Sequence, residues 1–409
     1  MGANDLMISS STVGRLPSDW TLASFDITPR TRLVFGNGAV HRLGAILDGI
    51  SCRRVLLVTD PGIVRAGHAE RVHRALGGDR RESAVFSGVR ENPDTACVDD
   101  CLAIARQFRP DVIVGLGGGS SMDTAKGCNF LLTNGGRMQD YWGVGKATQA
   151  MLPFVAIPTT AGTGSECQSA ALISDATTHQ KMACLDPKAA AYVALLDPEL
   201  TVSQPAGVTA CTGIDAVAHA VETAVSAKRN PISSMYSREA FGLLVPSLPL
   251  VLQNPEHLEA RGRMLLGAAL AGMAIEQSML GAAHSAANPL TAHFGVIHGV
   301  AVGLMLPHVV RFNAADPMVR GVYAELATAA GLGEIGAPPD HAVEALVRRL
   351  EELLDAAAMP RTLKALDVDL GQVPALARDA AGQWTANFNP IPIQASDFAG
   401  LYEAAWAGS

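Results

Sequence analysis

Residues 111–126 have the sequence DVIVGLGGGSSMDTAK, which decides the fold of the first half of the chain. Asp111–Leu116 is an apolar run of the kind that forms a buried strand in a parallel sheet. Gly117, Gly118 and Gly119 follow directly and open a segment that favours a helix. Glycines at such a turn let backbone amides approach a pyrophosphate, and the helix N-terminus adds partial positive charge. Because the stretch matches neither the GxGxxG fingerprint nor a Walker A loop, a purely structural turn is the alternative.

The sequence on either side of this stretch repeats the same pattern. Arg54–Asp60 and Phe154–Pro158 are further apolar runs that we predict as strands, and Asp94–Phe108 is rich in helix formers. Strands that alternate with helices at this spacing are typical of a parallel α/β sheet of the nucleotide-binding kind. We therefore predict a dinucleotide-binding α/β domain over residues 1–204.

The second half of the chain has a different pattern. Beyond Gln204–Pro205 few alternating β-branched residues remain, and long helical stretches follow. The predicted helices are Glu239–Gln253, Leu258–Ile275, Pro317–Ala330 and His341–Ala357. We predict a helical domain over residues 205–409, with a cleft between the two domains.

Composition excludes several classes of protein. The net charge of −8 gives no electrostatic reason to expect nucleic acid or an anionic membrane as a partner. No apolar run reaches the roughly 18 residues that a membrane span needs, and the first residues lack the pattern of a secretory signal. The 7 cysteines include no CxxC pair, which favours reduced thiols in a cytoplasmic protein over a disulfide framework.

Four residues of the second half are candidate metal ligands: Asp215, His219, His284 and His298. Asp215 and His219 are four positions apart, so on a helix they point from one face. One carboxylate and three imidazoles suit Fe(II) or Zn and leave a position open for a substrate oxygen. Each residue also has an ordinary alternative: Asp215 can complete a capping pattern with Thr212, and a lone histidine is usually a core or surface group.

A second loop and one aspartate add to the nucleotide hypothesis. The loop follows the predicted strand Phe154–Pro158, and its hydroxyl residues are Thr159, Thr160, Thr163 and Ser165. They can bind a ribose or the nicotinamide amide, or simply cap a helix. Asp60 ends an earlier strand, where a carboxylate accepts hydrogen bonds from ribose hydroxyls and repels a 2′-phosphate, favouring NAD over NADP. An ordinary turn-forming aspartate before Pro61 is the alternative.

Together these residues resemble the iron-containing (group III) alcohol dehydrogenases, and the match runs through nearly the whole chain. The shared motifs are Phe35–Gly38, Asn92–Asp94, Gly117–Ser120 with Asp123 and Lys126, Pro158–Thr163, Asp197–Pro198, Asp215–Glu222, His284, His298–Gly299 and Leu306–Pro307. The resemblance implies a Rossmann-like domain followed by an all-helical domain, a two-domain architecture like that of dehydroquinate synthase. It also implies a divalent metal, usually Fe(II) and sometimes Zn, on Asp215, His219, His284 and His298.

The same resemblance assigns the dinucleotide site, and Lys181 matches the family lysine near the ribose. The implied cofactor-binding residues are Asp60, Asn92, Pro93, Gly117, Gly118, Gly119, Ser120, Asp123, Thr159, Thr160, Thr163, Ser165 and Lys181. Many members of the family are dimers or larger, so we expect a homodimer or a larger homo-oligomer.

The chain departs from the family at Asn288. Members of the family commonly carry a histidine there, four residues after the ligand that matches His284, and it is credited with proton relay or substrate positioning. Asparagine does not titrate near neutral pH, so a general acid or base role is lost at this position. His293 is a candidate replacement that acts through a water, or else an ordinary surface residue. We keep Asn288 and His293 as the candidate catalytic residues.

The predicted function is a metal-dependent, NAD(H)-linked alcohol dehydrogenase or aldehyde reductase that transfers hydride between nicotinamide and a primary alcohol or aldehyde bound to a divalent metal. Ala170 and Ile275 match positions that face the family's pocket, and both are apolar, which suggests an uncharged substrate. Two alternatives are a dehydroquinate-synthase-like lyase and a catalytically altered protein that only binds nucleotide and metal. The lyase needs a basic pocket for an anionic substrate, and few Lys or Arg residues lie near His284–His308.

Overall fold

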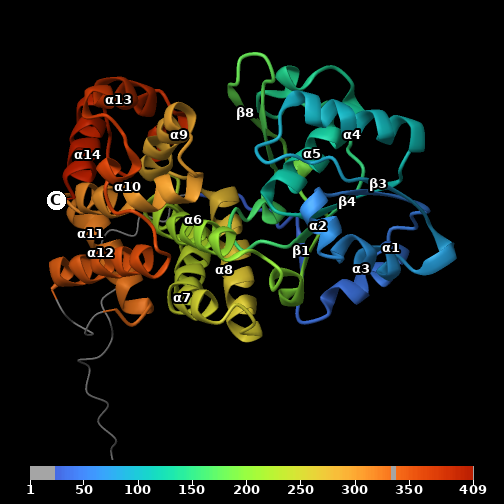
Figure 1. The fold of residues 1–409 in the computed structure, drawn as a ribbon, viewed down its shortest axis with the longest axis horizontal. Helices are drawn as coiled ribbons and strands as arrows, with labels where there is room; N and C mark the ends of the chain where they lie inside the picture. Colours follow the sequence, from blue (N-terminus) through green and yellow to red (C-terminus); the bar gives the residue numbers. More distant parts are fainter. Residues whose placement is uncertain (1–23, 333–337, 409) are drawn as a thin grey trace, which may run out of the picture.

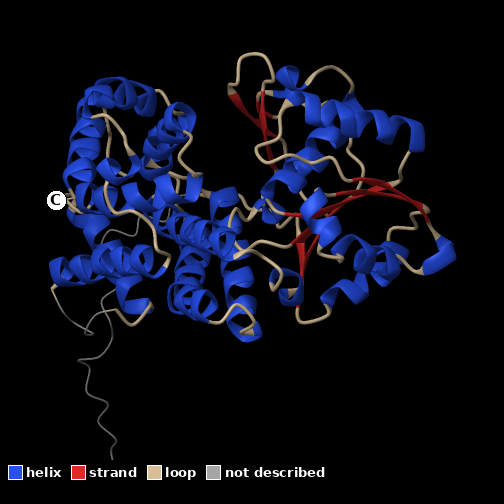
Figure 2. Ribbon diagram, viewed as in Figure 1, coloured by secondary structure: helices blue, strands red, loops and turns tan. Residues whose placement is uncertain are grey.

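The computed structural model describes residues 24–332 and 338–408, with a parallel sheet in the first half and helices in the second (Figures 1 and 2). The sheet is formed by β1 (Arg32–Phe35), β2 (Arg54–Val58), β3 (Glu82–Phe86), β4 (Val112–Gly117), β6 (Phe154–Pro158) and β9 (Val193–Leu196). The strand order is β1-β9-β6-β4-β2-β3, and every neighbouring pair is parallel. The predicted fold class is therefore confirmed.

Helices cover both faces of the sheet, and successive strand residues point to opposite faces, so both sets of side chains are buried. In β2, Leu56 and Val58 enter one hydrophobic cluster, while Val55 and Leu57 enter another on the other face. The first cluster includes α4 (Thr95–Phe108) and α5 (Gly119–Asn134), and the second includes α1 (Leu43–Asp48) and α3 (His68–Ala75). Because helices pack on both faces of the sheet, every residue of a central strand is buried, which explains why the strands have continuous apolar sequences.

A small second sheet was not predicted from the sequence. It consists of β5 (Gly143–Val144), β8 (Lys181–Leu185) and β7 (Ala170–Ser174), with β7 and β8 antiparallel. Its strands are short, and β5 pairs with β8 over only two residues, so the sequence gives a weak periodic signal.

The second half consists of helices. They are α6 (Ala206–Val225), α7 (Pro231–Gln253), α8 (Leu258–Gln277), α9 (Ala282–Phe294), α10 (His298–Asn313), α11 (Pro317–Ala329), α12 (Pro339–Ala356), α13 (Val373–Ala381) and α14 (Ala395–Ala407). Helix α7 begins well before the predicted start at Glu239. Asn230 accepts hydrogen bonds from the Ile232 and Ser233 amides, and Pro231 occupies the first helical position, a start signal that the sequence analysis missed.

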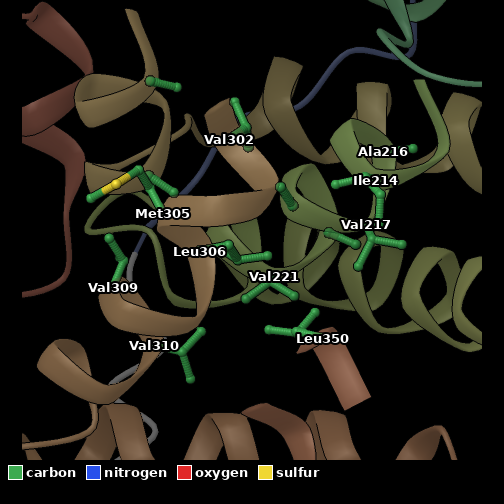
Figure 3. Close-up of a cluster of buried hydrophobic side chains, with 14 of the residues drawn as sticks. Ile214, Ala216, Val217, Val221, Val302, Met305, Leu306, Val309, Val310 and Leu350 are labelled. Carbon is green, nitrogen blue, oxygen red and sulfur yellow. The ribbon is translucent and has the colours of Figure 1, made fainter. Parts of the chain in front are cut away.

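Buried apolar side chains pack α6, the helix that carries two of the candidate metal ligands, against α10 (Figure 3). Ile214, Val217 and Val221 of α6 belong to the same buried cluster as Val302 and Leu306 of α10. These α6 residues lie on other sides of the helix from Asp215 and His219, so packing sets the direction in which the ligands point. Within the described ranges no single helix has the length and apolarity of a membrane span, although α8 and α9, bent by 104°, pass together by length and composition.

Candidate active site

The four candidate metal ligands converge from three helices. Asp215 and His219 lie one turn apart on α6, His284 lies in the first turn of α9, and His298 begins α10. The Nε2 atoms of His219, His284 and His298 are 3.5, 3.3 and 3.8 Å from Asp215 Oδ1. The rings of His219 and His284 stack with centroids 4.9 Å apart. Asp215, His284 and His298, separated by up to 83 positions in the sequence, thus place three ligand atoms within 4.8 Å of one another, and His219 joins them through its contact with Asp215.

A glycine brings the last of these ligands into place. A Cβ atom on Gly299 would lie 2.2 Å from the carbonyl oxygen of Cys211 in α6. Only glycine therefore lets the first turn of α10 approach α6 this closely. Because His298 is the neighbouring residue, this contact positions its ring beside Asp215.

The charges of the cluster suit a divalent cation. Burial alone would raise the pKa of Asp215, but the surrounding histidines outweigh it and lower the pKa, so the carboxylate is ionised. Desolvation of its ring lowers the pKa of His298, which leaves the imidazole neutral. An ionised carboxylate beside neutral imidazole is the form that binds metal, and the N3O donor set fits Fe(II) or Zn. The His298 side chain is 36% exposed, so the cluster is open on that side.

Glu222 orients one of the candidate ligands, a role that was not predicted from the sequence. Its Oε1 accepts a hydrogen bond from the Ala283 amide at 2.7 Å, and its Oε2 pairs with His284 Nδ1. This contact keeps Nδ1 protonated and leaves Nε2 to face Asp215. Burial lowers the pKa of His284, but the carboxylates of Glu222 and Asp215 outweigh it and raise the pKa to about 10, so without metal this ring is protonated and must release its Nε2 proton when a metal binds. Glu222 is seven residues after Asp215, so a helical projection of the sequence already placed both on one face.

The two predicted nucleotide loops lie side by side. They follow β4 and β6, which are neighbours in the sheet. A Cβ on Gly118 would meet Thr160 at 3.3 Å, and one on Gly119 would meet Thr163 at 2.9 Å. Thr159 donates its amide hydrogen to the Gly117 carbonyl at 3.0 Å. Because these glycines have no side chains, the loop that carries the threonines can pack against the N-terminus of α5.

Asp60 reaches the same place from the next strand. Its Oδ1 accepts hydrogen bonds from the Gly62 and Ile63 amides at 2.7 and 3.0 Å and caps α2 (Pro61–Arg65). Its Oδ2 would lie 3.3 Å from a Cβ on Gly117. The direction in which successive strands are added to the sheet reverses between β2 and β4. Strand β3 lies beside β2 at one edge, whereas β6 and β9 lie on the far side of β4. Open α/β sheets bind ligands at such a switch point, beyond the carboxyl ends of the strands.

Other predicted cofactor residues support the loops. The Asn92 amide donates to Ser120 Oγ at 3.2 Å, and the Pro93 carbonyl accepts from the Ser174 amide. Ser165 Oγ donates to Asp123 Oδ1 at 3.0 Å, and both residues are buried.

Lys126 and Lys181 lie at the edges of this arrangement. Lys126 is buried and its Nζ donates to the carbonyls of Ser165, Gln168 and Ala170 at 2.6–2.9 Å, so α5 holds the second loop. Lys181 is exposed on β8, and its ammonium group contributes to the lowered pKa of His298.

The comparisons agree with this geometry. Residues 29–198 match the family described as iron-containing alcohol dehydrogenase, and residues 209–406 match the C-terminal part of the same family. The chain belongs to the iron-containing alcohol dehydrogenases. The resemblance inferred from the sequence is thereby confirmed.

Relatives of this family member cover almost all of its length. An NAD-dependent methanol dehydrogenase of Bacillus methanolicus is 33% identical over 384 residues, 94% of this chain and 100% of the relative. A crystal structure of a 1,3-propanediol oxidoreductase has a TM-score of 0.90 at 31% identity and covers 94% of this chain and 100% of that one. A sulfoacetaldehyde reductase from Bifidobacterium kashiwanohense in complex with NAD+ has a TM-score of 0.85 at 29% identity, covering 93% and 98%. As a member of the family, the chain is an oxidoreductase of the alcohol dehydrogenase type, and neither the lyase nor the binding-only alternative is favoured.

The two candidate catalytic residues occupy different surroundings in this alcohol dehydrogenase. Asn288 is one turn after His284 on α9, and its Nδ2 donates to Gln383 Oε1 at 3.0 Å. His293 is nine positions after His284, which puts it on the opposite face of the helix. Its side chain is 52% exposed and pairs with Asp379 at 2.7 Å. Asn288 therefore lies one turn from His284 on the same face of α9, whereas His293 lies on the opposite face and at the surface.

Proposed function

We propose that the protein is an NAD(H)-linked, metal-dependent alcohol dehydrogenase that interconverts an uncharged primary alcohol and its aldehyde. The observation that carries the proposal is the convergence of Asp215, His219, His284 and His298 in one cluster. These four residues would hold Fe(II), with Zn as the second candidate. When bound, the metal supplies Lewis acidity toward the substrate oxygen, and the nicotinamide supplies or accepts the hydride.

The chain's own residues bind and orient. The amides at the N-terminus of α5 bind the pyrophosphate beside Gly118 and Gly119, where a side chain would collide with the threonine loop. The Asp60 carboxylate accepts hydrogen bonds from the ribose and repels a 2′-phosphate, which selects NAD over NADP. Glu222 fixes the His284 ring so that its Nε2 stays directed at Asp215.

The proton path differs from that of relatives with a histidine at position 288. Asn288 cannot take or give a proton near neutral pH, so its amide can only position the substrate. His293 lies on the far face of α9 and is paired with Asp379, which favours a surface role for it. We propose that protons reach bulk water through the exposed side of the cluster beside His298.

The physiological setting follows from the same observations. All seven cysteines are free and six of them are buried, as expected for a reducing compartment. We propose a cytoplasmic enzyme that forms a homodimer or a larger homo-oligomer, as the resemblance to the family implies. Analytical ultracentrifugation of the full chain tests the assembly, and a single monomeric species would refute it.

The deciding experiment is anaerobic reconstitution of metal-stripped protein with Fe(II), with Zn or with no metal. Each sample is assayed for NADH and NADPH oxidation with simple aldehydes, and metal content is measured in parallel. We expect metal-dependent turnover with a preference for NADH, and His298→Ala should lose metal retention and turnover together. Full activity without metal, or full activity of His298→Ala, would refute the proposal.

A further inference from the structure

Residues 159–165, the threonine loop, pack tightly against three helices. The loop lies against the N-terminus of α5 on one side. On a second side, a Cβ on Gly162 would lie 2.5 Å from Thr212 Cβ and 3.0 Å from the Thr212 carbonyl oxygen of α6. On a third side, a Cβ on Gly164 would lie 2.6 Å from Gly272 Cα of α8. Helix backbone cannot move aside as the end of a flexible side chain can, so a shift of the loop must be shared by the helices.

The contact with α6 lies on the side of this helix that carries candidate metal ligands. Thr212, Asp215 and His219 are at positions i, i+3 and i+7 of α6, which share one helix face. Gly162 therefore touches α6 about one turn before the first of these ligands. Because the threonine loop is also the segment that we assign to the nucleotide, one closely packed segment lies between the two cofactor sites.

The same loop carries the group that His219 lacks. Nε2 of His219 faces Asp215 at 3.5 Å, but its Nδ1 is buried and has no hydrogen-bond partner among the residues that the structure describes. Ligand histidines usually donate their second N–H group to a carboxylate or a carbonyl, as His284 does to Glu222. Burial lowers the pKa of His219, and the groups that oppose this shift include the Asp215 carboxylate and the backbone of Gly162. The Gly162 carbonyl thus lies beside the ring as an acceptor, and a small shift of the loop completes the hydrogen bond.

We propose that Gly162 is a positioning residue that links the two cofactor sites: its carbonyl orients the His219 ring, and its contact with Thr212 holds the threonine loop against α6, so that nucleotide and metal bind cooperatively. This rests on the proposed function and adds a linkage to it. A nucleotide that immobilises the loop fixes the acceptor for His219 and so strengthens metal binding. Thermodynamic linkage then requires that the metal strengthen nucleotide binding by the same factor.

The test measures this factor on metal-stripped, full-length protein. Isothermal titration calorimetry gives the affinity for Zn with and without saturating NAD+, and the affinity for NAD+ with and without Zn. We expect each ligand to strengthen the binding of the other about tenfold, which is within the usual range for coupled sites. The measurement involves no turnover, so it does not depend on knowing the substrate.

Two variants alter the contact in opposite ways. Gly162→Ala adds a Cβ that collides with Thr212 and displaces the carbonyl from His219, whereas Thr212→Gly removes the side chain on which the loop packs. Both should bring the linkage factor near one. Gly207→Ala, on the same helix with no atom within 4 Å of the added Cβ, is the matched control and should keep the parent factor. Circular dichroism establishes folding, and Thr212→Gly decides the question if Gly162→Ala does not fold.

The linkage factor separates positioning from a merely structural role. A structural role would lower stability, or both affinities together, and leave the factor unchanged. A parent factor that persists in the folded variants would overturn the inference, because a direct effect of bound metal on the nicotinamide would then produce it. Binding of both NAD+ and Zn to the parent without any linkage would refute this inference alone. A parent that binds neither refutes the proposed function itself.

Discussion

Replacing Glu222 by glutamine should weaken metal binding without removing any ligand. Glu222 accepts from the Ala283 amide at 2.7 Å, from the His284 amide at 3.4 Å and from His284 Nδ1. All these partners are donors, and glutamine has only one acceptor atom. Its NH2 group must therefore face a donor, and either the amides of α9 or the His284 ring loses its partner.

The expected loss follows from the role of such partners in other metal sites. Changing a group that hydrogen-bonds a metal-binding histidine typically costs about 10- to 100-fold in metal affinity, which is about 1.4–2.8 kcal/mol. The assay is competition for Zn between the protein and a chromophoric chelator, performed for the parent and Glu222→Gln. Glu239→Gln, at an exposed position of α7, is the control and should bind metal like the parent.

A folded Glu222→Gln protein that binds Zn within about twofold of the parent would refute this reasoning. It would mean that packing alone orients the His284 ring. Circular dichroism and the thermal midpoint, measured without metal, establish that the variant is folded. A loss of metal affinity in both variants would point to net charge and not to the contact with His284.

Three further predictions concern the cofactor, the packing and acid stability. Asp60→Asn keeps a capping oxygen but removes the charge that opposes a 2′-phosphate, so the preference for NADH in kcat/KM should fall by at least about tenfold; an unchanged preference would exclude Asp60 as the determinant. Gly272→Ala places a Cβ 2.4 Å from the Gly164 carbonyl and should lower the free energy of unfolding by about 1–3 kcal/mol, whereas Gly400→Ala, with no atom within 4 Å, should not. Burial lowers the pKa of His308 to about 4 from 6.5, so its stabilising contribution is complete above pH 6.5 and is lost as the pH falls toward 4. Urea unfolding at pH 7 and 5 should show a loss for the parent that is about 1–2 kcal/mol larger than for His308→Gln, and equal losses would contradict the assignment.

The sequence predicted those parts of the fold and site that depend on local pattern. The runs Arg54–Asp60 and Phe154–Pro158 are local patterns only a few residues long, and the structure has a strand at each of them. The glycine-rich turn is equally local, and it follows the predicted strand β4. The four candidate metal ligands were proposed because one carboxylate and three imidazoles suit a divalent metal and because the resemblance to the family assigns them to one. Sheet order was not predictable, because it depends on how helices pack on both faces.

The residues that orient the site were missed because their contacts are distant in sequence. Glu222 and His284 are 62 positions apart, and Asn288 and Gln383 are 95 positions apart. No local periodicity reports which side chains meet after helices pack. The position of His293, by contrast, could have been predicted from the sequence, because the helical repeat alone puts it on the face of α9 opposite His284.

The placement of the ligands along the chain also orders the assembly of the enzyme during synthesis. All four lie between residues 215 and 298, while the contacts that fasten the outer side of α9 come from residues 383–389. Translation proceeds from the N-terminus, so the complete ligand set leaves the ribosome about 85 residues before its final support. A nascent chain can therefore capture its metal while α9 is still open on one side. Arrival of the 383–389 segment then covers this side of α9, while the cluster stays open beside His298, so metal can enter before this segment is made and can still reach the folded enzyme from the other side.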